Sequence, residues 1–267
     1  MGWELLWILA VVAAVLSAVG FYKFVYFLSI GYGFAIAGIG VTLMILFHEQ
    51  MQLVHYVQCV LFILYGARLS GFLLYREIKN AAYRKTLTEA TTAEKTMPVF
   101  VKAFIWVWVA ALYVAQTCPV FYRQYNGATD ALLPWIGVAV SVIALVIETL
   151  ADQQKSAQKA KNPNMVATEG LYKMVRCPNY FGEILFWTGV FVGGLTALNS
   201  WGQWVMAIVA YLAIVFIMFN GAQRLEKRQS ARYGSMPEYR AYADKTPIIL
   251  PLLPIYHLAK PEEGKKQ

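Results

Sequence analysis

The chain has 267 residues, of which 59% are hydrophobic and only 14% are charged, whereas soluble globular domains carry roughly 25% charged residues. The net charge of +8 alone would permit a nucleic-acid partner. We predict none, because the basic residues flank apolar runs, as membrane topology signals do. The three cysteines are widely spaced without a CxxC pair, which argues against disulfides and zinc. We predict no metal site.

Apolar runs long enough to cross a hydrocarbon core of about 30 Å recur along the whole chain. A backbone in lipid must satisfy its own hydrogen bonds, so we expect these runs to be helices in one all-α membrane domain over residues 1–267. No Lys or Arg precedes the first run, unlike a secretory signal, so we expect it to remain as a span. The seven predicted spans cover residues 3–21, 24–46, 53–75, 98–120, 132–150, 181–198 and 201–221.

Lys and Arg are concentrated in alternate connections between these spans. Residues 76–97 and 151–180 hold five each and the tail after 221 holds nine, whereas 47–52 and 199–200 hold none. With seven spans, the basic segments all fall on one side of the membrane. The positive-inside rule predicts that this side, with the C-terminus, is cytoplasmic and that the N-terminus is outside.

An ionisable residue within a span is costly and is usually paired or functional. Arg68 lies in the third span, and Tyr65, three residues earlier, shares its helical face. A cation beside a phenol strengthens the phenol as a hydrogen-bond donor. The pair also fits an arginine that reaches the membrane interface beside an interfacial tyrosine.

A second polar cluster ends the fifth span. Glu148 and Asp152 are four residues apart on one face, with Lys155 and Lys159 beyond them. The carboxylates suit ribose hydroxyls or amide protons, and the lysines suit phosphates. A solvated helix end is the alternative reading.

A third cluster lies at the entry to the sixth span, where Pro178 breaks the backbone and Gly182 permits close approach. Four polar side chains converge there at one membrane depth, a pattern that favours a ligand cradle over a helix cap. They are Arg176, Asn179, Tyr180 and Glu183. The chain has no GxGxxG or P-loop pattern, so any nucleotide is bound outside those frames.

The segment Gly170 to Glu183 resembles a signature of the membrane steroid 5α-reductases, the sterol reductases and their bacterial relatives, Gly-Leu-(aromatic)-x-x-x-Arg-His-Pro-Asn-Tyr-x-Gly-Glu. The chain departs from it at Cys177, where the family has His. Tyr65-x-x-Arg68 is similar to a motif of the steroid enzymes. The resemblance covers residues 60–255.

This resemblance implies a seven-span protein of the bacterial inner membrane, with NADPH in a cytoplasm-facing cavity and a lipid-like substrate entering from the bilayer. Asn179 and Glu183 would bind the nicotinamide end of NADPH. Tyr65 would face the substrate carbonyl, paired in the steroid enzymes with a second-span glutamate for which Glu49 is the nearest candidate. The other implied cofactor contacts are Arg68, Arg76, Lys79, Glu148, Asp152, Lys159, Arg176, Tyr180 and Arg224, the last closing the site.

The expected chemistry explains these roles. Hydride reduction of an enone places the hydride on the β-carbon and negative charge on the carbonyl oxygen. A donor aimed at that oxygen stabilises the enolate by about 3–4 kcal/mol, and Tyr65 is the candidate donor. The resemblance thus implies NADPH-dependent reduction of a carbon–carbon double bond conjugated to a ketone in a steroid-like lipid.

Two other functions fit parts of the pattern. Membrane isoprenylcysteine methyltransferases share a related Arg-His-Pro-x-Tyr-x-Gly motif and bind S-adenosylmethionine. A sterol-binding or channel protein without enzymatic activity would explain the spans. Glu183, the Asp152-Gln153 element and Tyr65 favour the reductase.

Overall fold

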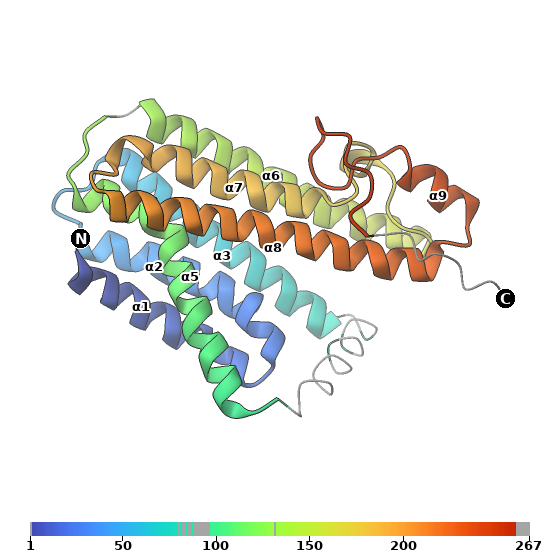
Figure 1. Cartoon of the computed structure of the whole chain (residues 1–267), viewed down its shortest axis with the longest axis horizontal. Coiled ribbons are helices and arrows are strands. Elements are labelled where there is room, and N and C mark those ends of the chain that lie inside the picture. The colour runs from blue at the N-terminus through green and yellow to red at the C-terminus, as the bar shows by residue number, and fades with distance from the viewer. Residues whose placement is uncertain are drawn as a thin grey trace. The chain divides into compact units, whose positions relative to one another are not determined.

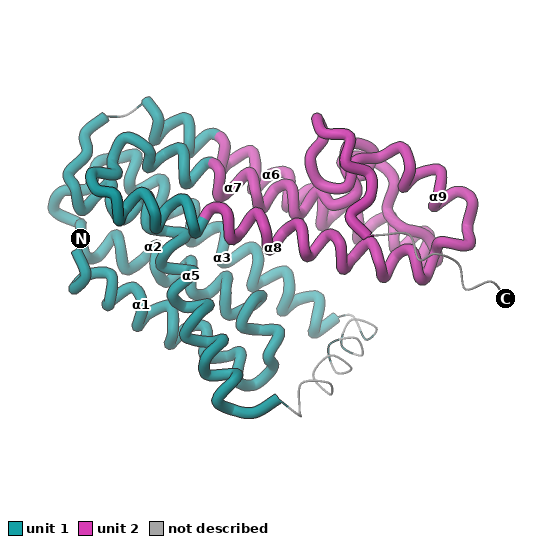
Figure 2. The backbone as a smooth tube through the Cα atoms, in the orientation of Figure 1, with its two compact units in different colours: residues 1–139, 189–210 teal, residues 140–188, 211–267 magenta. Residues whose placement is uncertain are grey.

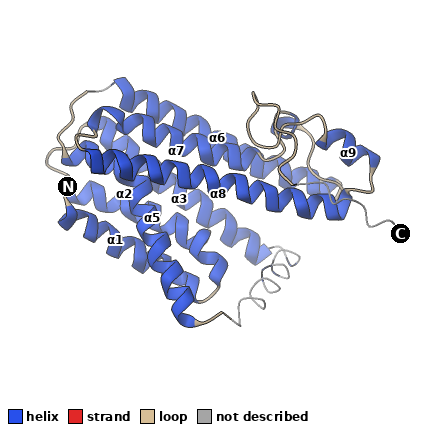
Figure 3. Ribbon diagram, in the orientation of Figure 1, coloured by secondary structure: helices blue, strands red, loops and turns tan. Residues whose placement is uncertain are grey.

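The computed structural model describes residues 2–79, 81, 84, 87, 97–130 and 132–259, and this described part consists of helices and loops without a strand (Figure 3). Figure 1 labels the eight longer helices. They are α1 (Trp3–Ser17), α2 (Ile30–Leu46), α3 (Leu53–Lys79), α5 (Val99–Tyr125), α6 (Leu132–Lys161), α7 (Pro178–Gly194), α8 (Trp201–Tyr233) and α9 (Pro237–Ala243). Short 3-10 helices cover Ala18–Phe21, Phe24–Leu28, Gly170–Lys173 and Leu195–Ala197.

Seven helical segments among the described residues are long and apolar enough to cross a membrane, which confirms the all-α, seven-span prediction. The first two, Trp3–Phe21 and Phe24–Leu46, have the predicted bounds. The others are Leu53–Lys79, Val99–Tyr125, Leu132–Lys161, Pro178–Ala197 and Trp201–Tyr233.

Several helices run on beyond the predicted spans. The third, fifth and seventh end at Lys79, Lys161 and Tyr233 instead of residues 75, 150 and 221. Lys, Arg, Gln and Glu are good helix formers, so a helix need not end where its apolar run ends. The sixth begins at Pro178 instead of 181, because proline fits the first turn, where its missing N–H has no helical partner to lose.

The chain divides into two compact units (Figure 2). Unit 1 comprises Met1–Ala139 and Gly189–Ala210, and unit 2 comprises Val140–Thr188 and Tyr211–Gln267. The boundaries fall within α6, α7 and α8. The expectation of a single domain over residues 1–267 stays a prediction.

In unit 1, α2 packs closely against α3 through small residues. A Cβ on Gly33 would lie 2.8 Å from the carbonyl oxygen of Gly66, and a Cβ on Gly66 would lie 2.1 Å from that of Gly33. The hydroxyl of Ser70 on α3 donates to the carbonyl of Ile30 on α2 over 2.8 Å. Small residues at such contacts let two membrane helices approach closely. Because Gly66 directly follows Tyr65 on α3, this contact holds the part of α3 that carries Tyr65 against α2.

An ion pair between buried Arg123 and Asp130, whose side chain is 40% exposed, lies in another part of unit 1. Arg123 on α5 has no exposed surface, and its guanidinium donates to the carbonyl of Gly193 over 3.0 Å and to Oδ1 of Asp130 over 2.5 Å. The hydroxyl of Thr196 donates to the other oxygen of Asp130 over 2.6 Å. Burial alone would raise the pKa of Asp130, but the Thr196 hydrogen bond and the Arg123 charge outweigh it and lower that pKa.

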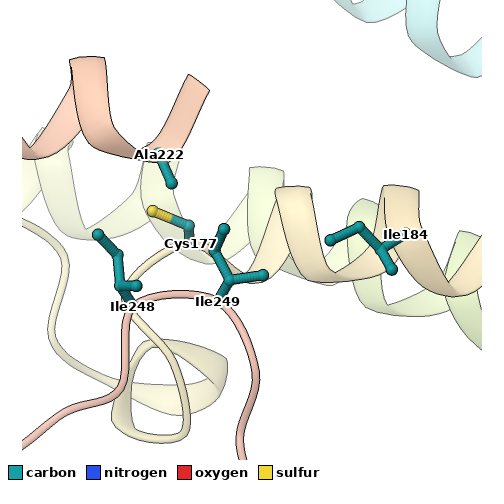
Figure 4. Close-up of a cluster of buried hydrophobic side chains, with 5 residues drawn as sticks. All are labelled: Cys177, Ile184, Ala222, Ile248 and Ile249. Atoms are coloured by element: carbon teal, nitrogen blue, oxygen red, sulfur yellow. The ribbon is translucent and has the colours of Figure 1, made fainter. Parts of the chain in front are cut away.

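In unit 2, the segment after α9 packs on the start of α7 and on α8. Figure 4 shows the buried cluster that results, which contains Cys177, Ile184, Ala222, Ile248 and Ile249. The backbone N–H of Cys177 donates to the carbonyl of Ile248 over 2.9 Å. The signature segment and the C-terminal segment are therefore built as one structure.

Candidate functional site

The predicted signature in unit 2 is held by two glutamines of α6. The side-chain oxygen of Gln154 accepts the N–H of Leu171 over 2.8 Å, and that of Gln158 accepts the N–H groups of Thr168 and Glu169. Gly170 has a φ of +65°, and a Cβ there would lie 2.4 Å from the oxygen of Gln154. The loop before α7 thus needs this glycine and takes its shape from α6.

Asp152, Asn179 and Tyr172 form a continuous polar chain. The side-chain amide of Asn179 donates to Oδ1 of Asp152 over 2.5 Å. The hydroxyl of Tyr172 lies 3.3 Å from Oδ1 of Asn179 and 3.2 Å from the carbonyl oxygen of Ala151. Burial, with a smaller effect of Asp152, raises the pKa of Tyr172 above its ordinary value, so this phenol stays a neutral donor. The structure therefore brings together two of the predicted cofactor residues.

Two predicted carboxylates are buried on the two helices that carry Asp152 and Asn179. Glu148 lies on α6 and Glu183 lies on α7. Glu183 accepts a hydrogen bond from the indole of Trp187 over 3.0 Å. A Cβ on Gly182 would lie only 2.4 Å from Cγ of Glu148. The glycine of the signature lets α7 pass directly over the carboxylate side chain from α6.

Arg176 is engaged within the protein. Its guanidinium pairs with Glu226 of α8 over 2.7 Å and donates to the carbonyl of Tyr256, and both side chains of the pair are 2% exposed. The other oxygen of Glu226 accepts the N–H groups of Leu258 and Ala259. His257 completes the network, with Nδ1 at 2.9 Å from Glu226. Here Arg176 anchors the C-terminal segment.

Cys177, the departure from the family pattern, lies in the apolar cluster of Figure 4. Burial raises the pKa of its thiol to about 12, more than the nearby Arg176 and Lys155 lower it. The side chain therefore acts as a small hydrophobe. Cys59 and Cys118 are also buried and free of disulfides, as the sequence predicted.

The other predicted residues of unit 2 differ in their surroundings. The ammonium of Lys159 donates to the carbonyls of Pro163 and Met165 and, over 2.9 Å, to the hydroxyl of Tyr233. These three contacts use all its donors. The ring of Tyr180 lies against α8, 3.3 Å from a Cβ built on Gly221. Arg224 is exposed on α8.

In unit 1, Tyr65 is fully buried among aromatic side chains. Its ring meets that of Tyr32 on α2 edge to face, with centroids 5.8 Å apart, and the Tyr32 ring lies 4.9 Å from that of Tyr113 on α5. The hydroxyl of Tyr113 donates to the carbonyl of Phe27. Arg68 is half-buried, one turn beyond Tyr65.

The structure does not bring Glu49 to Tyr65. Glu49 lies in the turn between α2 and α3, where its side chain is 88% exposed and 3.8 Å from His48. Tyr65 lies about 18 Å along α3 from its first residue, Leu53. Tyr32, a residue of the second span, has its ring against that of Tyr65.

Arg76 and Lys79 lie in the last turn of α3. The guanidinium of Arg76 lies 5.5 Å from the centroid of the Phe72 ring, and Lys79 is exposed. Between them, Glu77 forms an ion pair with Lys23 and accepts a hydrogen bond from Tyr26 over 2.5 Å. These bonds tie the end of α3 to the segment before α2.

Sequence reasoning missed several residues that shape the site. Gln154 and Gln158 are four residues apart, which was the available signal, since i and i+4 residues share one helix face. No local pattern indicated that Glu226 would meet Arg176, or that the hydroxyl of Tyr242 would donate to the carbonyl of Tyr172 over 2.7 Å.

Comparison with known proteins agrees with the signature. Residues 12–246 match a family described as "Protein of unknown function (DUF1295)". "Steroid 5-alpha-reductase DET2" of Gossypium hirsutum is 20% identical over 191 residues, 69% of each chain. "Uncharacterized protein C594.04c" of Schizosaccharomyces pombe is 30% identical over 139 residues, and the match spans 45% of this chain but only 39% of the yeast protein. No solved structure matches. The chain therefore belongs to the DUF1295 family, which is the steroid 5α-reductase-like family.

Proposed function

We propose that the protein uses NADPH to reduce a carbon–carbon double bond conjugated to a ketone in a steroid-like lipid. The observation that carries this proposal is the polar chain of Asp152, Asn179 and Tyr172 at the start of α7, with Glu183 buried one turn further on. Polar side chains in or beside a span are costly and are usually paired or functional. A scaffold without a ligand has no need to gather several of them at the start of one helix.

The residues present suit a nicotinamide cofactor. A carboxamide offers two N–H donors and one acceptor, and carboxylates with an asparagine amide supply the complementary groups. In this proposal Asn179 and Glu183 orient the carboxamide, and Asp152 holds Asn179 in place. When bound, NADPH supplies a hydride. Arg76, Lys79 and Arg224 are proposed to meet its phosphates, because hydrogen bonds from arginine or lysine to phosphate are charge-assisted.

Tyr65 is proposed as the donor to the substrate carbonyl. Its side chain is buried among the rings of Tyr32 and neighbouring aromatic residues, which exclude water. A hydrogen bond made in a dry environment is electrostatically stronger than one made in water. In this role the phenol donates to the oxygen on which negative charge develops, and Arg68 supports it. Glu49, exposed in its turn, is not needed for this step.

The proposal places the substrate and the protein in the bilayer. Seven apolar helices make this an integral membrane protein. A cytoplasmic C-terminus and a bacterial inner membrane are part of the proposal, since the basic segments and NADPH would then share one compartment.

Ligand-dependent thermal unfolding in detergent tests the cofactor. We expect NADPH at about 100 times its Kd to stabilise the protein by roughly 2.7 kcal/mol. S-adenosylmethionine is expected to have no effect, and Asn179→Ala to abolish the NADPH effect while the protein stays folded. Stabilisation by S-adenosylmethionine alone would assign the protein to the methyltransferases.

Turnover of a 3-oxo-Δ4 steroid tests Tyr65 separately. Tyr65→Phe removes only the hydroxyl, so NADPH binding is expected to persist while turnover falls by about 10²-fold or more, the usual loss when one oxyanion donor is removed. Unchanged turnover would remove Tyr65 from the mechanism, and a parallel loss of NADPH affinity would place it at the cofactor instead.

A further inference from the structure

The segment Pro247–Ile255 has no polar side chain. Its sequence is Pro-Ile-Ile-Leu-Pro-Leu-Leu-Pro-Ile, with Lys245 and Thr246 before it and Tyr256 and His257 after it. Nine residues are too few to cross a bilayer, and short apolar segments of this kind are typical of interfacial or re-entrant structure. Polar residues on both sides fit a segment that enters and leaves an apolar phase from the same side.

Backbone hydrogen bonds fold this segment into a closed turn. The N–H of Ile248 donates to the carbonyl of Ile255 over 2.8 Å, and that of Leu253 donates to the carbonyl of Leu250 over 3.2 Å. Pro251 and Pro254 have no N–H group that would need a partner. The turn therefore lowers the main cost of placing irregular backbone in lipid, which is unsatisfied polar groups.

The inner side of the turn packs against apolar stretches of α7 and α8 in unit 2. Ile248 and Ile249 are buried in the same cluster as Ile184 (Figure 4), which lies about 9 Å along α7 from Pro178. Val215 and Phe219 of α8 pack against this cluster. α8 becomes polar only after these residues, at Asn220, Gln223 and Arg224. The turn thus lies beside helix segments that belong to the membrane.

The outer side of the turn is uncovered and apolar. The side chain of Leu252 is 92% exposed and that of Leu253 is 46% exposed. On α8, Leu212 and Phe216 are likewise exposed, as residues that face lipid are. A protruding leucine on a hydrogen-bonded, proline-braced turn is suited to insertion into the boundary between headgroups and acyl chains.

We propose that residues 250–255, the apolar turn, insert into the bilayer interface beside α7 and α8. Lipid is the partner, since the turn packs on helices that already face lipid and its exposed tip is wholly apolar. The turn would anchor the C-terminal segment, which is joined to the signature through Cys177 and Arg176. This inference does not depend on the identity of the cofactor or substrate.

Fluorescence of a label on Leu252→Cys in proteoliposomes tests this proposal. The native cysteines are buried, so an environment-sensitive thiol dye is expected to react only at the new position, with unlabelled wild-type protein as the blank. We expect blue-shifted emission and strong quenching by lipids with a nitroxide near the headgroup end of the acyl chain. Leu253→Cys provides a second reporter on the same turn.

Ser235→Cys is the matched control, because Ser235 is exposed in the polar turn before α9. The label at Ser235 is expected to be quenched by aqueous iodide. Its quenching by the nitroxide lipid is expected to be severalfold weaker than that of the label at Leu252. Iodide quenching at Leu252 equal to that at Ser235 would overturn the proposal. Protection of Leu252 that disappears when the protein is diluted into excess lipid would also overturn it, since a second copy would then cover the turn.

Discussion

Asn179 donates a hydrogen bond from its side-chain amide to Oδ1 of Asp152 over 2.5 Å, while its side-chain oxygen faces the hydroxyl of Tyr172 at 3.3 Å. An asparagine side chain has distinct donor and acceptor ends, so these two neighbours fix its orientation. The relationship joins α6 to the first turn of α7. It explains why Asp152 matters for a residue that lies 27 positions away.

Replacing Asp152 with alanine removes the acceptor that holds the Asn179 amide. A hydrogen bond to a charged group contributes about 1.5–3 kcal/mol, and about 1.4 kcal/mol corresponds to tenfold in affinity. We therefore expect Asp152→Ala to weaken NADPH binding by about tenfold or more. Fluorescence titration of NADPH in detergent measures this change. Ser156→Ala, at an exposed position one turn further along α6, is the control and is expected to bind normally. Equal affinities would contradict the role of Asp152.

Gly182→Ala is expected to destabilise the protein. The new Cβ would lie 2.4 Å from Cγ of Glu148 and 3.3 Å from the carbonyl oxygen of Ala144. Overpacking of this kind typically costs about 1–3 kcal/mol. Gly71→Ala on α3 is the matched control, because no atom lies within 4 Å of its Cβ position. Its thermal midpoint should stay or rise slightly, and equal midpoints for the two variants would refute the contact.

The thiol of Cys177 is expected to resist alkylation in the folded protein. Burial raises its pKa to about 12, so almost no reactive thiolate exists at pH 8. Mass spectrometry after iodoacetamide treatment measures the modification. We expect none at Cys177 before unfolding and complete modification after it. Rapid labelling of the folded protein would show that the apolar cluster opens.

Acid is expected to weaken unit 1 through Asp130. Its folded pKa is lowered from the ordinary value of 3.8 by Thr196 and Arg123 despite burial. A depressed carboxyl pKa gives stability that is fully present above the unfolded pKa and is lost as pH falls through the folded pKa. The contribution should therefore decline below about pH 4. Thermal unfolding of wild type and Asp130→Asn between pH 3 and 7 measures it, and parallel curves over this range would contradict the assignment.

The seven spans could be predicted because apolar length is a local property. The end of α6 could not, since Gln154, Gln158 and Lys159 continue the helix although they are polar. Within the site, Asn179 and Asp152 were both predicted, and the structure adds that they touch. Their pairing depends on how α6 meets α7, which neither segment shows alone.

Long-range contacts account for the remaining differences. Arg176 was predicted as a cofactor ligand from its place in the signature, and this stays a prediction. The structure adds Glu226, 50 residues later, as its ion-pair partner. Glu49 was chosen as a carboxylate near the second span, whereas the structure places the ring of Tyr32, a residue of that span, against Tyr65. Spacing along one helix cannot reveal which neighbouring helix supplies a contact.

Transfer of deuterium from NADPH that carries deuterium at both positions of the nicotinamide C4 tests the proposed reaction most directly. The purified protein in lipid is incubated with the labelled cofactor and a 3-oxo-Δ4 steroid, and the product is analysed by mass spectrometry and NMR. We expect one deuterium on the former β-carbon, with the ketone retained and the label absent from the Tyr65→Phe reaction over the same time. A product without deuterium, or with the ketone reduced and the double bond intact, would contradict it.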